Sequence, residues 1–136
     1  MTTARRATAA AALLALAGTV VLSACGSDEP GASGSQSTGA VETAVDRDGV
    51  QVLEVKAGDD LRFQQTDLRA TTGKIKINLD VTGRVPHNLA FTDGNKGSTG
   101  TTSDATTSVT LQFDKPGTYH FLCTIHPKMR GTLTVS

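Results

Sequence analysis

The sequence lacks net charge, blocks of like charge and an abundance of aromatic residues. Thirteen basic residues balance 13 acidic ones, so the composition gives no sign of the basic surface that nucleic acids require. Aromatic residues make up only 4% of the 136 residues, whereas glycine occurs 14 times. Val, Ile, Leu and Thr alternate with polar residues in short runs. The length suffices for one domain, and this composition predicts that it is rich in β-strands.

The N-terminus has the features of an export signal. Arg5 and Arg6 precede an apolar stretch over residues 7–21. Residues 22–25 (Leu-Ser-Ala-Cys) resemble the lipobox of bacterial lipoproteins, in which the cysteine is acylated and begins the mature chain. An uncleaved membrane helix and a plain secretory signal are the alternatives, and all three export the rest of the chain.

These signals divide the chain into three parts. We predict a signal peptide over residues 1–24, then a lipidated Cys25 and a flexible Gly/Ser linker over residues 25–40, and a domain over residues 41–136. A linker of this kind reaches about 20 Å on average. The protein would be extracytoplasmic and lipid-anchored to the outer face of a bacterial cell membrane.

Residues 41–136 show short apolar alternations between turn residues and no helical period. Ile75, Ile77 and Leu79 alternate with polar residues and form the clearest half-buried strand. Residues 93–107 are polar and rich in glycine, which predicts a long loop. We therefore expect an all-β fold, a two-sheet antiparallel β-sandwich of seven to eight strands.

The most informative residues lie near the C-terminus. Cys123, His126 and Met129 are spaced three apart directly after an expected strand, and His87 lies upstream. Thiolate and thioether are soft ligands and imidazole is borderline, and together they form the donor set of a type-1 (blue) copper electron-transfer centre. A strand end followed by a tight loop can direct three side chains to one point, while an adjacent strand supplies His87. The set predicts one copper ion.

Other interpretations of these residues carry less weight. A buried cysteine, a histidine before proline and a methionine after a turn are each common, but their joint spacing is not. Zinc also binds cysteine and histidine, but methionine argues against it. His120 has the opposite parity to Cys123 on its strand and should point away, so we do not count it as a ligand. Because Cys25 and Cys123 each have a local role, no disulfide is expected.

Two short motifs resemble the cupredoxins, the family of type-1 blue copper proteins. Residues 117–131 (Gly-Thr-Tyr-His-Phe-Leu-Cys-Thr-Ile-His-Pro-Lys-Met-Arg-Gly) resemble the C-terminal ligand motif, in the short Cys-x-x-His-x-x-Met form of the amicyanin-like members. Residues 85–88 (Val-Pro-His-Asn) resemble the first-histidine motif. The resemblance implies a Greek-key β-sandwich with copper near one end. It also implies the ligand roles: equatorial His87, Cys123 and His126, and weak axial Met129.

Neighbouring residues refine this resemblance. Asn88 follows the first histidine as in the family, where this amide braces the ligand loops by hydrogen bonds, and Thr124 is the expected partner. Ile125 and Lys128 depart from the amicyanin-like motif, which has a proline and an aromatic residue there. A charge at Lys128 argues against a purely apolar docking patch. A second Gly-containing turn before the first-histidine motif leaves residues 50–65 as a candidate extra hairpin.

We therefore predict a membrane-tethered copper protein that carries one electron at a time through Cu(I)/Cu(II) and meets redox partner proteins. No nucleophile–base pair is recognisable, so we do not expect an enzyme. The alternative is an extracytoplasmic copper-binding carrier or resistance protein. Carriers favour Met- or His-rich surfaces, whereas this chain has only Met1 and Met129. The complete ligand set argues against a third alternative, a sandwich that has lost its metal and only binds protein.

Overall fold

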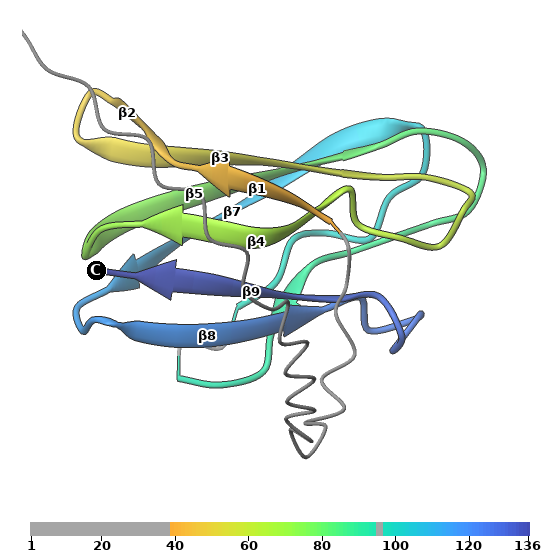
Figure 1. Ribbon diagram of the computed structural model, residues 1–136. Helices are drawn as coiled ribbons and strands as arrows, with labels where there is room; N and C mark the ends of the chain where they lie inside the picture. Colours follow the sequence, from red (N-terminus) through yellow and green to blue (C-terminus); the bar gives the residue numbers. More distant parts are fainter. Residues whose placement is uncertain (1–38, 95–96) are drawn as a thin grey trace, which may run out of the picture. The chain divides into compact units, whose positions relative to one another are not determined.

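The computed structural model describes residues 39–94 and 97–136, which form two facing β-sheets (Figure 1). Five strands form one sheet in the order β1-β4-β9-β8-β6, and four form the other in the order β2-β3-β5-β7. The strands are β1 (Ala40–Thr43), β2 (Val45–Arg47), β3 (Val50–Ala57), β4 (Gln65–Ala70), β5 (Gly73–Val81), β6 (Ala90–Phe91), β7 (Ala105–Phe113), β8 (Gly117–Leu122) and β9 (Arg130–Val135). The predicted signal peptide and Cys25 lie outside the described residues. Within the described ranges, no helix is long and apolar enough to cross a membrane.

The strand directions correct one expectation. Both sheets are mixed, because β1–β4, β4–β9 and β3–β5 pair in parallel and the other pairs are antiparallel. Between β3 and β5 the chain crosses to the other sheet as β4 and then returns, so β3 and β5 run in the same direction. The described chain has nine strands rather than seven to eight. Three of them, β1, β2 and β6, have only 4, 3 and 2 residues, too few to show an alternating pattern in the sequence.

The suggestion that residues 50–65 form an extra hairpin is wrong. β3 lies inside the four-stranded sheet between β2 and β5, and β4 belongs to the other sheet. Residues 58–64 connect them as a loop in which Leu61 has a positive φ of 58° and Ala57 bridges to Phe63. The next strand, β4, begins only at Gln65.

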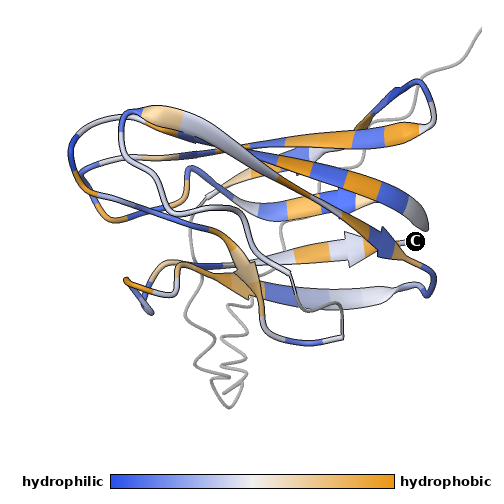
Figure 2. Cartoon of the chain, turned by 180° about the vertical axis from the view of Figure 1, so that it is seen from behind, coloured by the Kyte–Doolittle hydropathy of each residue, from blue (hydrophilic) through white to orange (hydrophobic). Residues whose placement is uncertain are grey.

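The core lies between the two sheets and follows the predicted alternation. In β5, Ile75, Ile77 and Leu79 are fully buried while their neighbours are more exposed, which confirms the half-buried strand. The other sheet contributes buried side chains such as Leu68 and Leu133. Figure 2 shows the alternation as orange and blue bands along the long strands. Burying each large aliphatic side chain contributes about 1.5–3 kcal/mol, so a register slip of one residue would be costly.

Strand polarity brings three loops to one end of the sandwich. β9 begins directly after residues 123–129, and β4 runs parallel to it after residues 58–64. β5 ends at Val81, and residues 82–89 follow. We call this group of loops, residues 58–64, 82–89 and 123–129, the Cys123 end. The turns at residues 48–49, 71–72 and 114–116 form the opposite end.

Candidate metal centre

The loop between β8 and β9 carries three of the predicted ligands. Cys123 directly follows the last residue of β8, and Met129 directly precedes β9. The backbone closes the loop on itself: the Cys123 N–H donates to the Met129 carbonyl at 3.0 Å, and the Met129 N–H donates to the His126 carbonyl at 2.8 Å. Cys123 is fully buried and Met129 is 3% exposed. A short closed loop of this kind fixes its side chains with little remaining conformational freedom.

His87 comes from the loop between β5 and β6, not from a strand as expected. Only Ala90 and Phe91 of this segment are in a strand, and His87 forms an isolated antiparallel bridge with Thr102. The ring is fully buried, and its Nε2 lies 3.0 Å from the Gly58 carbonyl. Because a carbonyl can only accept, Nε2 carries the proton and Nδ1 keeps a free lone pair.

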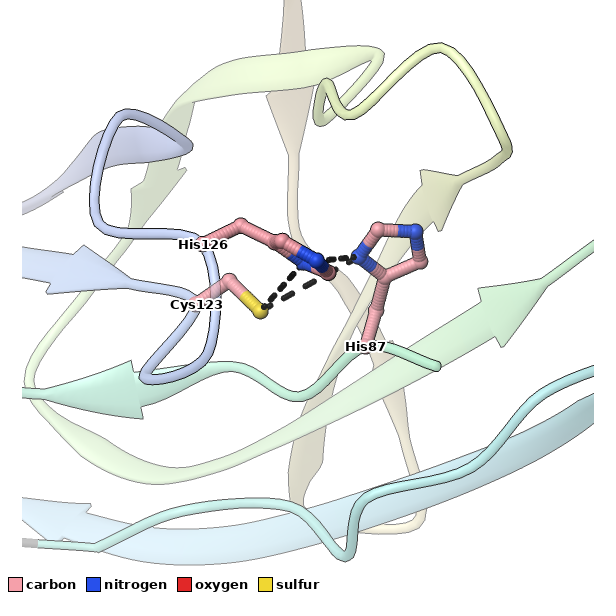
Figure 3. A group of neighbouring side chains, drawn as sticks. All are labelled: His87, Cys123 and His126. Carbon is pink, nitrogen blue, oxygen red and sulfur yellow. Dashed lines mark hydrogen bonds between the residues drawn. The ribbon is translucent and has the colours of Figure 1, made fainter. Parts of the chain in front are cut away.

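The three side chains meet at one point, as Figure 3 shows. The Nδ1 atoms of His87 and His126 are 3.2 Å apart, and the Cys123 Sγ lies 3.6 Å from His126 Nδ1 and 3.9 Å from His87 Nδ1. All ligand atoms of the three lie within 4.8 Å of one another. Two imidazoles and a thiol, with the buried Met129 in the same loop, are a donor set that fits one type-1 copper ion.

Burial of His87 favours the protonation state that can bind a metal. Desolvation lowers the pKa of His87, and a positive charge on the nearby His126 would lower it further, although the Gly58 carbonyl opposes the shift. A lowered pKa means that the His87 imidazole stays neutral near pH 7. Since only neutral imidazole can ligate a metal, this environment favours the binding form.

Asn88 and Thr124 join the two ligand loops. The Asn88 amide donates to the Thr124 hydroxyl at 2.8 Å, and the Thr124 N–H donates to the Asn88 carbonyl oxygen at 2.8 Å. Asn88 is 7% exposed and Thr124 is exposed, so these bonds are partly buried. The structure thus brings together the pair predicted to support the site, and their bonds connect segments 36 residues apart.

Two supporting groups were missed in the sequence. The Gly58 carbonyl orients His87, and Asp59 Oδ1 accepts from the N–H groups of Arg84 and Val85 at 2.8 and 2.9 Å. These contacts join the loop after β3 to the loop before His87. A backbone carbonyl has no side-chain signature, and a glycine followed by an aspartate indicates only a turn. Neither partner could therefore be found without the fold.

His120 lies apart from the buried cluster. Its side chain is 62% exposed and its Nδ1 pairs with Asp93 Oδ2 on the surface. The Thr92 hydroxyl and then His120 hydrogen-bond to Asp93 and lower the pKa of its carboxyl group. The three histidines therefore divide into two that converge on Cys123 and one that forms a surface pair.

Comparison with known proteins identifies the family. Residues 12–135 match the family described as a cupredoxin-like domain. The chain belongs to the cupredoxin family. This cupredoxin is similar to amicyanin-alpha of Methylorubrum extorquens, with 31% identity over 107 residues that cover 76% of this chain and 87% of that protein.

Solved structures confirm the cupredoxin β-sandwich. Auracyanin A, a "blue" copper protein from Chloroflexus aurantiacus, matches with a TM-score of 0.55 and 20% identity, over 65% of this chain and 100% of that one. The metal-binding domain of the Cu(I)-exporting P-type ATPase of Streptococcus pneumoniae matches with a TM-score of 0.57 and 16% identity, over 71% and 96%. At these identities the likeness shows the fold alone.

Proposed function

We propose that this cupredoxin is a one-electron carrier held at the membrane by a lipid. His87, Cys123 and His126 would be the equatorial copper ligands and Met129 the weak axial ligand. The observation that carries the proposal is the convergence of the three ligand atoms within 4.8 Å in a buried site. When bound, copper supplies the change between Cu(I) and Cu(II).

The residues of the chain favour electron transfer over substrate chemistry. The side-chain bonds between loops hold the ligands in one arrangement, so the same geometry can serve both oxidation states. Four protein ligands would also leave no coordination position for a substrate, unlike catalytic metal sites. His126 is only partly buried and is followed by exposed residues, whereas His87 is enclosed. His126 is therefore the proposed edge through which the electron passes to a redox partner protein.

Reversible redox cycling tests electron transfer against copper delivery. In voltammetry of the copper-loaded protein, we expect matched oxidation and reduction waves over repeated cycles. A Cu(I) chelator added to the reduced protein should remove copper slowly. A carrier would instead give irreversible waves and transfer its Cu(I) to the chelator at once, and that result would replace our proposal with the copper-carrier alternative.

The lipid anchor is a separate claim, supported by the Leu-Ser-Ala-Cys box at residues 22–25. We expect Cys25→Ala to move the protein from the membrane fraction and to abolish an acyl mass on the mature N-terminus. Cys123→Ser is the matched control, because it removes the other cysteine and should leave fractionation unchanged. Membrane association that persists in Cys25→Ala, without an acylated peptide in the wild type, would disprove the anchor.

A further inference from the structure

We propose that the Cys123 end docks on the anionic lipid surface that carries the anchor, so that His126 faces the bilayer. The inference rests on the proposed lipidation of Cys25. It starts from a topological fact: β1 runs parallel to β4, and β4 runs parallel to β9. β9 starts at the Cys123 end, so β4 and β1 also start there, and the chain enters the domain beside the metal centre (Figure 1).

The register fixes this entry point closely. Ala40 pairs with Gln65, the first residue of β4, and its N–H donates to the Gln64 carbonyl at 2.7 Å. Gly39 packs so closely on Thr66 that a Cβ at Gly39 would lie 2.6 Å from the Thr66 Cγ2. The point where the chain enters the domain is therefore held against the start of β4. The loop that contains Leu61 and Arg62 lies directly before β4 in the chain.

The length of the preceding chain favours this end for the membrane. Thirteen residues, 26–38, lie between Cys25 and Gly39, and a Gly/Ser-rich chain of that length spans about 20 Å on average. The nine residues of β5 measure about 30 Å along the sandwich. To bring the opposite end to the membrane, the linker would have to span at least that length, at a cost in chain entropy. The Cys123 end lies within its mean reach.

The surface at this end has the chemistry of an interfacial contact. An open groove of about 530 Å³ lies between residues 61–62 and residues 125–129. Leu61 and Ile125 on its walls are each 46% exposed, although both are large and apolar. Arg62 and Lys128 are the charged side chains among the groove residues, and both are exposed. Apolar side chains beside cations fit the interfacial region of an anionic bilayer.

The neighbouring charges leave this cationic character in place. Arg84 and Arg130 are exposed at the same end. Asp59, Asp60 and Asp104 also lie there, so the four cations outnumber three carboxylates, and Asp59 Oδ1 accepts from the backbone N–H groups of Arg84 and Val85. This contrasts with the proposed mature chain, which is mildly acidic: removal of Arg5 and Arg6 with residues 1–24 leaves 11 basic and 13 acidic residues. The four cations therefore lie at the end of the domain that the lipid anchor would keep close to the membrane.

Docking in this orientation defines the class of redox partner. An electron leaving through His126 would reach a partner embedded in the membrane, or one whose redox group lies at the headgroup level. A soluble partner would have to displace the domain from the lipid first. The partner class thus follows from the direction of β1 and the charge of the groove.

Site-specific fluorescence in vesicles tests the orientation, because the chain contains no tryptophan. Full-length protein processed and lipidated in cells is reconstituted into vesicles of equal phosphatidylglycerol and phosphatidylcholine, with or without bromine on the phosphatidylcholine chains. Ile125→Trp and, independently, Leu61→Trp report the Cys123 end. Lys115→Trp, in the β7–β8 turn, is the matched control at the opposite end. Comparing brominated with plain vesicles cancels any quenching by copper.

We expect bromine to reduce the emission of Ile125→Trp and Leu61→Trp at least about twofold, since interfacial side chains insert by about 5–10 Å, and to leave Lys115→Trp nearly unchanged. Added Arg62→Gln and Lys128→Gln should weaken this quenching, because each cation near an anionic leaflet strengthens binding about fivefold. Lys74→Gln with Lys115→Gln removes two cations from the opposite end and should not weaken it. High salt should also weaken the quenching, as Arg62→Gln with Lys128→Gln does, because it screens the attraction between the cations and the anionic lipid.

Equal quenching at both ends, or none at either, would overturn the proposal. Quenching that depends on the protein-to-lipid ratio but not on bromine would point to a second copy of the chain in the groove and would also overturn it. The acyl mass and the copper spectrum of the same preparation separate the possible failures. An unacylated Cys25 removes the premise, whereas a blue, acylated protein without selective quenching contradicts only the docking.

Discussion

The two ends of the sandwich are held by different kinds of contact. At the Cys123 end, side-chain bonds join residues far apart in sequence: Asn88 and Thr124 are 36 residues apart, and His87 and Gly58 are 29 apart. At the opposite end side-chain bonds also join distant residues, such as Gln51 and Thr71, but these bonds are exposed, whereas the bonds of Asn88 and His87 are partly buried. Exposed bonds compete with water, whereas partly buried bonds between loops can position a site. The comparison explains why copper ligands can be fixed in loops.

A glycine at each end gives the largest expected difference. At Gly131, near the start of β9, a Cβ would lie 2.6 Å from Phe121 Cε2 and 2.8 Å from the Thr66 carbonyl oxygen. Gly131→Ala should therefore lower the free energy of unfolding by about 2–3 kcal/mol, which is the upper end of the usual cost of overpacking. At the opposite end Gly49 has a φ of +79° but nothing within 4 Å. Gly49→Ala should cost about 1 kcal/mol, from the backbone conformation alone.

Urea denaturation of the metal-free protein measures both changes. We expect Gly131→Ala also to perturb copper binding, because Gly131 lies two residues after Met129, while Gly49→Ala should not. Equal losses of stability from the two substitutions would show that close packing beside the ligand loop has no special importance.

The side chains that tie each end give the second contrast. Asn88→Ala removes a 7%-exposed side chain and leaves the Thr124 N–H without its partner, so we expect a loss of about 2 kcal/mol. Gln51 at the opposite end bonds to Thr71 and Thr72 at a more exposed position. Water can replace these bonds, so Gln51→Ala should cost less than about 1 kcal/mol.

The copper spectrum makes this second contrast specific. Asn88→Ala should alter the visible spectrum and speed copper loss, since it frees one ligand loop from the other. Gln51→Ala should leave both unchanged, as measured by absorption and by the rate of copper transfer to a chelator. A normal spectrum and a normal off-rate in Asn88→Ala would show that the loop connection does not hold the ligands.

The smallest effect concerns the surface pair of Asp93 and His120. Hydrogen bonds from Thr92 and His120 lower the pKa of Asp93, so the folded state favours its carboxylate. This contribution is present above the unfolded pKa of about 3.9 and is lost as the pH falls through the lower folded value. Asp93→Asn should therefore flatten the acid limb of a plot of stability against pH, measured in urea.

Asp60→Asn, which removes another exposed carboxylate, is the control and should keep that limb steep. The copper spectrum at neutral pH should be the same in Asp93→Asn and the wild type, because the pair lies outside the buried cluster. A pH profile of Asp93→Asn identical to that of the wild type would contradict the contribution of this surface pair.

The sequence predicted what depends on local pattern and failed where contacts are distant. The alternation of Ile75, Ile77 and Leu79 revealed β5, because one face of the strand is buried and the other is polar. Cys123, His126 and Met129 were found because their spacing places them on one short loop. His87 was found from the Val-Pro-His-Asn motif at residues 85–88. The fold brings it beside the loop that carries Cys123 and His126.

What the sequence could not predict depends on the path of the chain between sheets. β1 and β2 are 4 and 3 residues long, with Val41 and Val45 exposed, so they lack an apolar face that would mark them. The parallel pairing of β3 with β5 requires a crossover that no local signal encodes. For the same reason the Gly58 carbonyl, which orients His87, could not be identified before the two loops were placed together.

The visible spectrum of the Cu(II)-loaded protein tests the central claim most directly. If Cys123, His87 and His126 hold copper, charge transfer from the Cys123 thiolate should make the protein intensely blue. The colour should disappear in Cys123→Ser and persist in Cys25→Ser, the substitution of the other cysteine. A colourless Cu(II) complex of the wild type, or a blue colour that survives in Cys123→Ser, would contradict the account.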